Sequence, residues 1–338
     1  MFAVIYCTVI YVHCHFIPLK EPKPTFALDY NYARRKAGSS APGSKTIAHL
    51  WELGGDISEP KLLEVPLTAN YLSSAAVVVV CDLSKPQNCL ASLLKWIVTV
   101  RAVIKQRIGD LQSTNATAAT AMKENAVAQY RELAPEPDAA RARPCEIPLY
   151  VVANKYDTFK NNPNRRTLMQ IIRFIAHFHG ATVITASSAD AVLKESFRST
   201  MNAICFRTSS KSVYEASVDK AVQISAGRDS FESILLGTVR DGDSSAGGKS
   251  RLASSESDFS LYLSSSSVTR DCWDRMGEIL SGLLGPPDPS AVKDKGAEEE
   301  ESKEQQQNEY PEAEIDEVRA QRDAALQRYI VVRTHILY

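Results

Sequence analysis

Residues 149–157 constrain the fold more than any other stretch of this chain. They read Leu-Tyr-Val-Val-Ala-Asn-Lys-Tyr-Asp, so five strand-forming or small residues lead into Asn154-Lys155-x-Asp157. Open α/β sheets bind their ligands at the carboxyl ends of the strands, which is where this polar motif falls. The stretch therefore predicts a buried strand that ends in a ligand-binding loop.

The spacing of Asn154, Lys155 and Asp157 is the one with which GTP-binding domains hold a guanine base. A carboxylate at Asp157 can accept both N–H groups on one edge of guanine, which adenine does not offer. The Asn154 amide can bond the other polar edge of the base, and the Lys155 stem can lie along its apolar face. An ordinary polar loop between a strand and a helix is the alternative.

Composition excludes several classes of protein. The net charge is −1 and 23 % of the 338 residues are charged, so no global field indicates binding to nucleic acid. Seven scattered cysteines without a Cys-x-x-Cys pair favour reduced thiols over disulfides or a zinc site. His13-Cys14-His15 lacks a second ligand pair at zinc spacing, so we expect no metal.

The first seventeen residues are unusually apolar and rich in β-branched side chains. They have no basic start and no small-residue cleavage site, and they are shorter than the roughly 20 residues of a spanning helix. We predict a buried strand here and no membrane insertion.

The rest of the chain alternates between strand and helix patterns. Strands are predicted over 25–32 and 46–53 as a hairpin, over 75–82 with both faces covered, and over 181–186. Helices are predicted over 86–108, 115–133, 165–179 and 190–206, with Gly180 as a left-handed cap. This rhythm predicts an α/β fold with a doubly wound, mostly parallel sheet.

The domain organisation follows from where the pattern fades, after Phe231. We predict an atypical apolar segment (1–20), the α/β domain (21–237), a Ser/Gly-rich linker (238–270), a short amphipathic helix (271–285), an acidic linker (286–310) and a carboxyl-terminal helix (311–338). The last helix is a candidate partner-binding element, with a frayed tail as the alternative. Its candidate contact residues are Ile315, Val318, Leu326 and Tyr329.

Three further loops would lie beside Asn154 in a GTP-binding domain. Thr25 opens a strand, where a threonine senses Mg²⁺ and the last phosphate. Glu52-Leu53-Gly54-Gly55 resembles the Asp-x-x-Gly loop but carries Glu for Asp, and Ser187 follows a strand where such domains brace the base. The candidate nucleotide-binding residues are Thr25, Gly54, Gly55, Asn154, Lys155, Asp157 and Ser187.

The phosphate cradle of such domains, Gly-x-x-x-x-Gly-Lys-Ser/Thr, does not occur in residues 1–24, which contain no glycine. Only about a dozen residues separate the apolar run from Thr25, too few for a cradle and a multi-turn helix. We therefore expect no cofactor, with GTP or another nucleotide bound only if a different amino terminus supplied a cradle. No nucleophile and base stand at a recognisable spacing, so we predict no catalytic residue and no enzyme.

Seven blocks carry a resemblance that covers residues 21–329: 23–35, 47–55, 82–86, 155–157, 173–181, 226–231 and 314–319. In this order they resemble the dynein light intermediate chain family, in particular its dynein 2 branch. The block Trp51-Glu52-Leu53-Gly54-Gly55 is similar to light intermediate chains in general. The block from Arg173 to His177 is similar to the dynein 2 branch.

This resemblance implies a Ras-like domain that serves as a non-catalytic subunit of the retrograde intraflagellar transport motor. It implies binding and stabilisation of the dynein 2 heavy chain, contact with other dynein 2 subunits and the intraflagellar transport machinery, an indirect link to microtubules, and support of cilium assembly. The implied locations are the cytoplasm and cytoskeleton, the cilium or flagellum, the basal body and the axoneme. Residues 1–19 replace the family's first strand and phosphate loop, so we expect the sheet to lack a proper first strand.

Two other hypotheses remain open at this point. A small GTPase-like nucleotide-binding enzyme would use the candidate residues around Asn154. A fragment too incomplete to fold would aggregate, because loss of a central strand exposes unpaired edges.

Overall fold

The computed structural model describes residues 2–7, 25, 27–36, 45–54, 60–206, 212–217, 220–236 and 270–288. All of these belong to one compact unit, Met1–Lys293. The predicted helix at 311–338, with Ile315, Val318, Leu326 and Tyr329, lies outside the described residues. So do residues 238–269 and 289–310 of the two predicted linkers.

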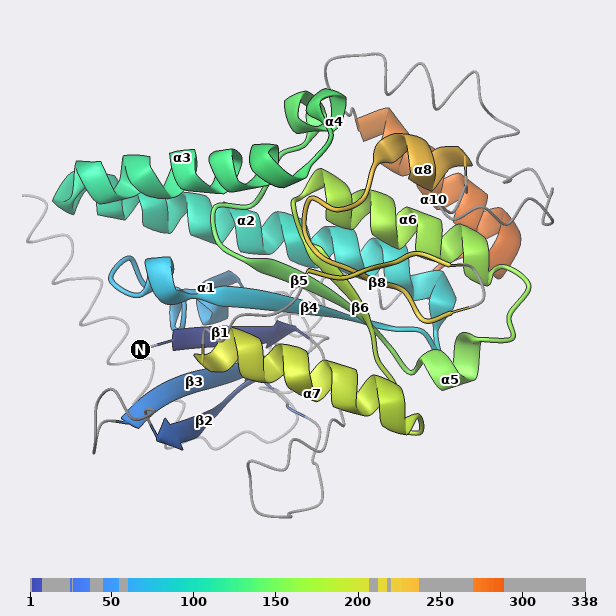
Figure 1. Cartoon of the computed structure of the whole chain (residues 1–338), viewed down its shortest axis with the longest axis horizontal. Helices are drawn as coiled ribbons and strands as arrows, with labels where there is room; N and C mark the ends of the chain where they lie inside the picture. The colour runs from blue at the N-terminus through green and yellow to red at the C-terminus, as the bar shows by residue number, and fades with distance from the viewer. Residues whose placement is uncertain are drawn as a thin grey trace, which may run out of the picture. The chain divides into compact units, whose positions relative to one another are not determined.

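Strands and helices alternate along the chain (Figure 1). The strands are β1 (Phe2–Cys7), β2 (Leu28–Lys36), β3 (Lys45–Leu53), β4 (Ala76–Asp82), β5 (Leu149–Asn154), β6 (Thr182–Thr185), β7 (Tyr214–Glu215) and β8 (Gln223–Ile224). The helices are α1 (Pro60–Glu64), α2 (Cys89–Thr114), α3 (Ala116–Leu133), α4 (Glu136–Arg141), α5 (Tyr156–Phe159), α6 (Arg165–Phe178), α7 (Ala191–Phe206), α8 (Phe231–Leu236) and α10 (Arg270–Leu284). Two 3₁₀ turns, η1 (Leu72–Ser74) and η2 (Pro86–Asn88), precede β4 and α2.

The strands form a single sheet in the order β2-β3-β1-β4-β5-β6-β8-β7. Neighbours from β3 to β6 run parallel, whereas β2 pairs antiparallel with β3, and β8 antiparallel with β6 and β7. This is a Ras-like, mostly parallel sheet that the small β7–β8 hairpin extends. The predicted fold class is confirmed, and so is the predicted hairpin of the first two long strands.

β1 occupies the centre of this sheet. It pairs with β3 from Phe2 opposite Ala48 to Cys7 opposite Leu53, and with β4 from Val4 opposite Ala76. The β-branched run is well suited to a strand with neighbours on both sides. The predicted strand in the first seventeen residues is confirmed. The expectation of a sheet without a proper first strand is wrong, because residues 2–7 form β1 inside the sheet of the Ras-like domain. These six residues therefore do not belong to a separate segment, contrary to the prediction.

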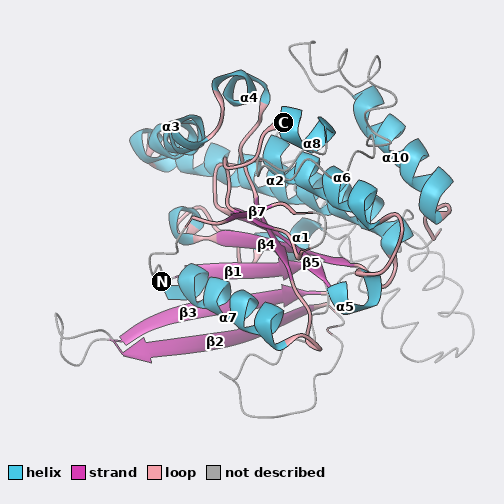
Figure 2. Ribbon diagram, turned by 45° about the vertical axis from the view of Figure 1, so that its right-hand side comes forward, coloured by secondary structure: helices cyan, strands magenta, loops and turns pink. Residues whose placement is uncertain are grey.

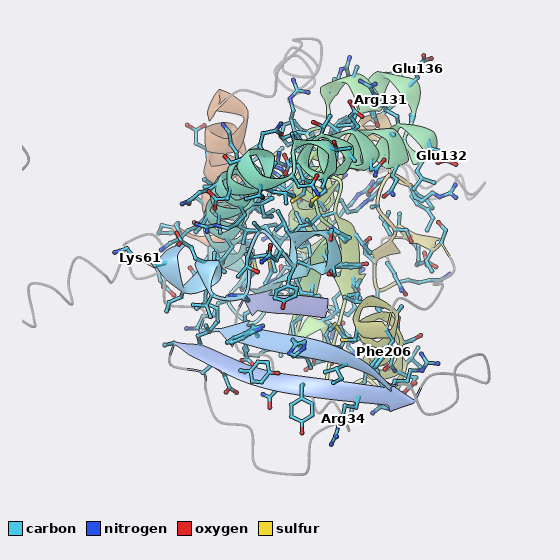
Figure 3. All side chains as sticks on the ribbon, turned by 90° about the vertical axis from the view of Figure 1, so that its left-hand side faces the viewer. Arg34, Lys61, Arg131, Glu132, Glu136 and Phe206 are labelled. Atoms are coloured by element: carbon cyan, nitrogen blue, oxygen red, sulfur yellow. The ribbon has the colours of Figure 1, made fainter. Side chains whose placement is uncertain are left out.

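Helices cover both faces of the sheet (Figure 2). β4 shows this directly, because Val77, Val79 and Cys81 lie in the larger core cluster, and alternate residues such as Val78 and Val80 lie in the smaller one. The larger cluster contains residues of α2 and α6, and the smaller one contains residues of α7. Arg131 on α3 and Arg34 on β2 mark opposite sides of these layers (Figure 3).

α2 and α3 form a long helical hairpin. Asn115 separates them and caps α3, because its side-chain oxygen accepts a hydrogen bond from the Ala118 N–H at 3.0 Å. α3 packs through Ala119 and Tyr130, both buried. Among the described residues, no helix has the length and apolar character needed to cross a lipid bilayer.

α10 packs against the Ras-like domain rather than standing apart from it. Met276 and Leu280 are buried in the larger core cluster. The Asn164 side-chain amide donates to the Leu283 carbonyl oxygen at 2.9 Å, just before the helix ends. The domain therefore extends past the predicted boundary at residue 237.

Candidate functional site

The loop after β5 lies at the carboxyl edge of the sheet, where Asn154 is opposite Asp82 at the end of β4. Lys155 adopts the left-handed conformation, with φ 59° and ψ 39°. It is the one non-glycine residue with positive φ in the part of the chain that the structure describes. Such a conformation costs on the order of 1 kcal/mol, and hydrogen bonds at the flanking residues, including Tyr156 N–H to the Ala186 carbonyl at 3.1 Å, hold the turn.

The ammonium group of Lys155 lies against the end of β4. Its Nζ is 2.6 Å from Asp82 Oδ2, while the N–H and hydroxyl of Ser84 donate to Asp82 Oδ1 at 2.9 and 2.6 Å. Burial alone would raise the pKa of Asp82, but the hydrogen bonds from Lys155 and Ser84 outweigh it and lower the pKa below its usual value. In this structure Lys155 thus serves as a clamp between β4 and β5.

The predicted base loop and the loop after β6 meet at Asp157. The Ser187 hydroxyl donates to Asp157 Oδ1, and the Ala189 N–H donates to the Ser187 hydroxyl at 3.1 Å. The structure therefore brings Asn154, Lys155, Asp157 and Ser187 together at one edge. One of the carboxylate oxygens that a guanine would use is already bonded to Ser187.

Thr25 and Gly54 lie together at the β2–β3 hairpin. The Thr25 hydroxyl donates to Glu52 Oε1 at 2.9 Å, and the Gly54 N–H donates to the Ala27 carbonyl at 2.9 Å. Burial raises the pKa of Glu52, and the hydrogen bond from Thr25 partly opposes that shift. Gly55, the glycine whose N–H would face a phosphate, lies outside the described residues.

β3, β1, β4 and β5 run parallel, so the candidate residues share the sheet edge at which β1 ends. β1 ends at Cys7 on that edge, and residues 8–24, which follow it in the sequence, contain no glycine and lie outside the described residues. A backbone cradle for phosphates depends on glycine for its tight turn and close approach. Asn154, Lys155, Asp157 and Ser187 thus remain candidates for contact with a base, and residues 8–24 contain no glycine for a triphosphate cradle.

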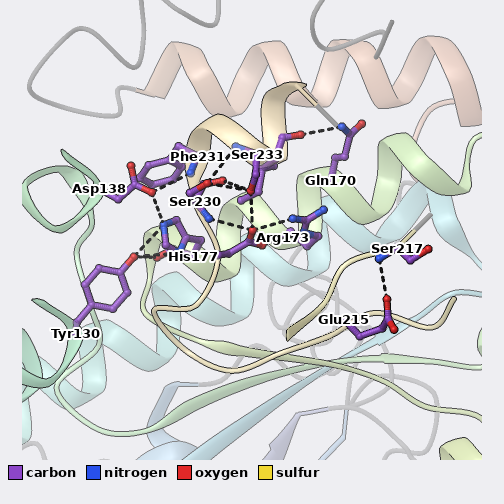
Figure 4. Close-up of polar contacts among 12 residues, drawn as sticks. Tyr130, Asp138, Gln170, Arg173, His177, Glu215, Ser217, Ser230, Phe231 and Ser233 are labelled. Atoms are coloured by element: carbon purple, nitrogen blue, oxygen red, sulfur yellow. Dashed lines mark hydrogen bonds and ion pairs between the residues drawn. The ribbon is translucent and has the colours of Figure 1, made fainter. Parts of the chain in front are cut away.

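A buried ion pair, which the sequence patterns did not reveal, joins two of the blocks quoted above (Figure 4). Arg173 Nε and Nη2 donate to Asp229 Oδ2 and Oδ1 at 2.8 and 2.7 Å. The two side chains are only 7 % and 4 % exposed. Burial tends to lower the pKa of Arg173, but the Asp229 carboxylate outweighs it and raises the pKa. The pair fixes the segment before α8 onto α6.

His177, one turn along α6 from Arg173, extends this contact to the α3–α4 segment (Figure 4). Its Nε2 lies 2.9 Å from Asp138 Oδ2, which also accepts the Phe231 N–H at 2.9 Å. The Tyr130 hydroxyl donates to the His177 carbonyl at 2.9 Å, and burial raises the pKa of Tyr130 so that it stays protonated. Arg173 and His177 are four residues apart, so the sequence could have predicted that both side chains lie on the same face of α6.

A surface depression lies between α6 and the β7–β8 segment, and Tyr156 of the candidate base loop contributes to its lining. Basic and polar side chains line it together with Met169, Ala216 and Val222, and Lys220 Nζ is paired with Glu215 Oε2 at 3.1 Å. Residues that line it include Arg165, Arg166, Gln170, Ser217 and Lys220.

Comparisons with known proteins agree on one family. The sequence model of the dynein light intermediate chain (DLIC) family matches residues 19–149. Cytoplasmic dynein 2 light intermediate chain 1 from Bos taurus is 30 % identical over 312 residues, which covers 92 % of this chain and 80 % of the relative. The Homo sapiens protein gives the same identity and coverage, and that of Danio rerio is 34 % identical over 214 residues, 63 % of this chain and 58 % of the relative.

A solved structure supports the fold. The crystal structure of the dynein light intermediate chain's conserved domain aligns with 88 % of this chain and 97 % of that chain, with a TM-score of 0.50. At 16 % sequence identity this similarity concerns the fold alone.

Proposed function

We propose, because this chain belongs to the dynein light intermediate chain family, that it is a non-catalytic subunit of the cytoplasmic dynein 2 motor complex. A role as a dynein subunit follows from the family itself. The observation that carries the dynein 2 assignment is the 30 % identity to dynein 2 light intermediate chains across 92 % of this chain.

Within that complex, the proposed role is to bind and stabilise the dynein 2 heavy chain for retrograde intraflagellar transport and cilium assembly. The proposed partners are the heavy chain, other dynein 2 subunits and the intraflagellar transport machinery, with microtubules as an indirect partner. The proposed locations are the cytoplasm and cytoskeleton, the cilium with its axoneme, and the basal body. The contacts of Lys155 with Asp82 and of Ser187 with Asp157 support a scaffold whose loops are held without a nucleotide.

The helix predicted over 311–338 is proposed as a second protein contact, through Ile315, Val318, Leu326 and Tyr329. Deletion of this segment should weaken the capture of at least one partner and leave the melting temperature of the Ras-like domain unchanged. Recovery of every partner at the full level after deletion would contradict this role.

Affinity purification of the tagged full chain from ciliated cells tests the main proposal. A dynein 2 heavy chain and ciliary transport proteins should be recovered in the eluate, as identified by mass spectrometry. Repeated recovery of the intact, folded chain without any dynein heavy chain would contradict it.

A second candidate function is a small GTPase-like nucleotide-binding enzyme. The observation that favours it is the cluster of Asn154, Lys155, Asp157 and Ser187 at the sheet edge. Titration with a fluorescent GTP analogue distinguishes the two. Binding in the micromolar range that Asp157→Ala abolishes would support the enzyme, whereas our proposal predicts no saturable binding for either protein.

A further inference from the structure

β2 is the outermost strand on one side of the sheet. It is nine residues long and pairs along its whole length with β3. Among the residues that the structure describes, no strand pairs with its other edge. A long edge strand is a template for another chain, and proteins normally guard such an edge or use it.

The hydrogen bonds show which backbone groups of β2 face outward. The Ala27 carbonyl accepts from Gly54, so position 27 faces β3. The Tyr30 N–H instead donates to the carboxylate of its neighbour Asp29 at 2.9 Å, so position 30 faces away from β3. Because the direction alternates along a strand, the even-numbered residues from Leu28 to Lys36 present their N–H and C=O groups at the outer edge.

One face of β2 carries exposed aromatic and basic side chains. Tyr30 and Tyr32 are 43 % and 49 % exposed, and Arg34 continues the row. Across the hairpin they lie opposite Trp51, His49 and Ile47 in turn. Aromatic residues and arginine on a surface are typical of protein interfaces.

These side chains are already held in place. The Tyr30 hydroxyl lies 2.7 Å from His49 Nδ1, and its ring is 4.7 Å from the Trp51 ring. Burial lowers the pKa of His49, so at neutral pH the ring is uncharged and its nitrogen can accept from Tyr30. The Arg34 guanidinium lies over the Tyr32 ring at 5.3 Å. Partners that bind here would therefore lose little entropy in ordering this row.

We propose that the outer edge of β2 binds β2 of a second copy of this chain, antiparallel and centred on Tyr32. Only residues whose N–H and C=O groups face the outer edge can exchange hydrogen bonds with the other copy, and these are the even-numbered residues of β2. In an antiparallel pair related by a two-fold axis, an even-numbered residue therefore lies opposite another even-numbered residue, and one residue at the centre lies opposite its own copy. Tyr32 faces outward and is the midpoint of Leu28–Lys36, so this register uses the whole strand.

The side chains match in this register. Asp29 lies opposite Arg35 of the other copy on one face, and Tyr30 lies opposite Arg34 of the other copy on the other face. Each pair occurs twice because of the two-fold axis. The contact of Arg34 with Tyr32 within one strand shows that this guanidinium already stacks on a tyrosine ring.

Neighbouring registers lose this match. A centre on Asn31 places Asp29 opposite Ala33, and a centre on Ala33 places Asn31 opposite Arg35, so neither forms an ion pair. Arg34 and Arg35 would repel a basic strand of another protein. In the Tyr32 register, β2 of the second copy supplies Tyr30 as the partner of Arg34 and Asp29 as the partner of Arg35. This complementarity identifies a second copy, rather than an unrelated strand, as the occupant.

Strand pairing alone buries less surface than the roughly 1,600 Å² of a standard stable interface, so we expect a dissociation constant of about 1 to 100 µM. Pairing also exchanges the contact of the Tyr30 N–H with Asp29 Oδ1 for ladder hydrogen bonds. This makes Asp29 Oδ1 available to Arg35, while Asp29 Oδ2 keeps the hydrogen bond from the Asn31 side-chain amide at 3.2 Å.

Sedimentation equilibrium of the purified full chain, over a range of concentrations, tests the proposal. Arg35→Asp should weaken dimerisation about tenfold, because it places like charges opposite each other at two positions. Asp29→Arg should have the same effect. The double variant Asp29→Arg/Arg35→Asp restores opposite charges and should recover most of the wild-type affinity.

Arg131→Asp is the matched control, since it makes the same charge change on exposed α3, at the opposite side of the layers (Figure 3). It should leave the dissociation constant unchanged. Melting temperatures of all variants separate weaker pairing from loss of folding. A wild-type chain that is monomeric at about 200 µM would overturn the proposal. So would equal effects of Arg35→Asp and Arg131→Asp, or a well-folded double variant that fails to dimerise. The test uses the isolated chain, so its outcome is independent of any motor partner.

Discussion

Arg173 and Asp229 show how single residues hold this domain together. The pair is bidentate and almost completely buried, and it ties the segment before α8 to α6. Removal of one partner leaves an uncompensated charge inside the protein, which costs far more than the intact pair contributes. The pair is therefore a sensitive point for folding although it takes part in no chemistry.

Asp229→Ala should lower the free energy of unfolding by about 3–5 kcal/mol, because Arg173 would remain charged in a buried site. Urea denaturation measures this change. Glu195→Ala removes an ion pair of the same kind from the surface of α7, where Glu195 is 66 % exposed, and should cost no more than about 1 kcal/mol. Similar losses in both variants would contradict the burial of the Arg173 pair.

His179 should make the protein less stable in acid. Burial, assisted by the nearby Arg101 cation, lowers the pKa of His179 to about 3. Below pH 6.5, His179 therefore binds a proton in the unfolded chain but stays neutral in the folded chain. The free energy of unfolding consequently falls as the pH decreases from 6.5 towards 3. Between pH 6.5 and 5 this group should account for about 2 kcal/mol.

The variant His179→Gln tests that assignment through the pH dependence of urea unfolding. It should flatten the loss of stability between pH 6.5 and 5. His49→Gln, at a half-buried site, should flatten it much less. An unchanged slope in His179→Gln would show that other groups cause the acid sensitivity.

At the scale of elements, regular patterns predicted most of the fold. The continuous apolar run of β4, the amphipathic stripe of α6 and the glycine after it all lie within a few residues of their predicted places, with Gly180 at φ +65°. The boundaries of α2 were less predictable, since η2 occupies Pro86–Asn88 and α2 then continues to Thr114. Helix ends depend on packing and capping that hydrophobic spacing does not contain.

The place of β1 could not be read from the sequence. Its composition indicated a strand, but its pairing with residues near Ala48 and Ala76 is a long-range property of the sheet. A phosphate cradle follows the first strand, so its absence from residues 1–24 does not exclude a strand at Phe2–Cys7. The presence of a strand and the presence of a phosphate-binding loop after it must therefore be predicted separately.

Ile5→Pro should prevent folding, because Ile5 lies between Trp51 of β3 and Val77 of β4. Proline removes a ladder hydrogen bond there and is tolerated almost only at sheet edges. Soluble yield and a cooperative melting transition measure the effect. Arg34→Pro, whose N–H faces the outer edge of β2, should retain a cooperative transition. An Ile5→Pro protein that melts like the wild type would contradict the central position of β1.

The candidate site was predictable only in part. Asn154, Asp157 and Ser187 could be placed together, because loops at the carboxyl ends of adjacent parallel strands meet. The contact of Lys155 with Asp82, 73 residues away, could not, since nothing in either local pattern specifies it. The cluster of Tyr130, Asp138 and His177 was missed for the same reason.

At the scale of the whole molecule, β1 lies between β3 and β4 in the Ras-like sheet, while residues 8–24 after it contain no glycine for a phosphate cradle. A ligand that binds only the folded state raises the melting temperature by an amount that grows with the logarithm of its concentration over its dissociation constant. We therefore expect millimolar Mg²⁺ and GTP to change the melting temperature by no more than about 1 °C. A rise of several degrees that Asp157→Ala abolishes would support the nucleotide-binding enzyme instead.

The central claim is that this Ras-like domain serves as a docking subunit of a dynein motor without the help of a nucleotide. Its most direct test is the capture of the dynein 2 heavy chain by the purified full chain, after removal of nucleotide and Mg²⁺. The account predicts that the heavy chain is recovered equally well with and without added GTP. Recovery only in the presence of GTP, or no recovery by a well-folded chain, would contradict it.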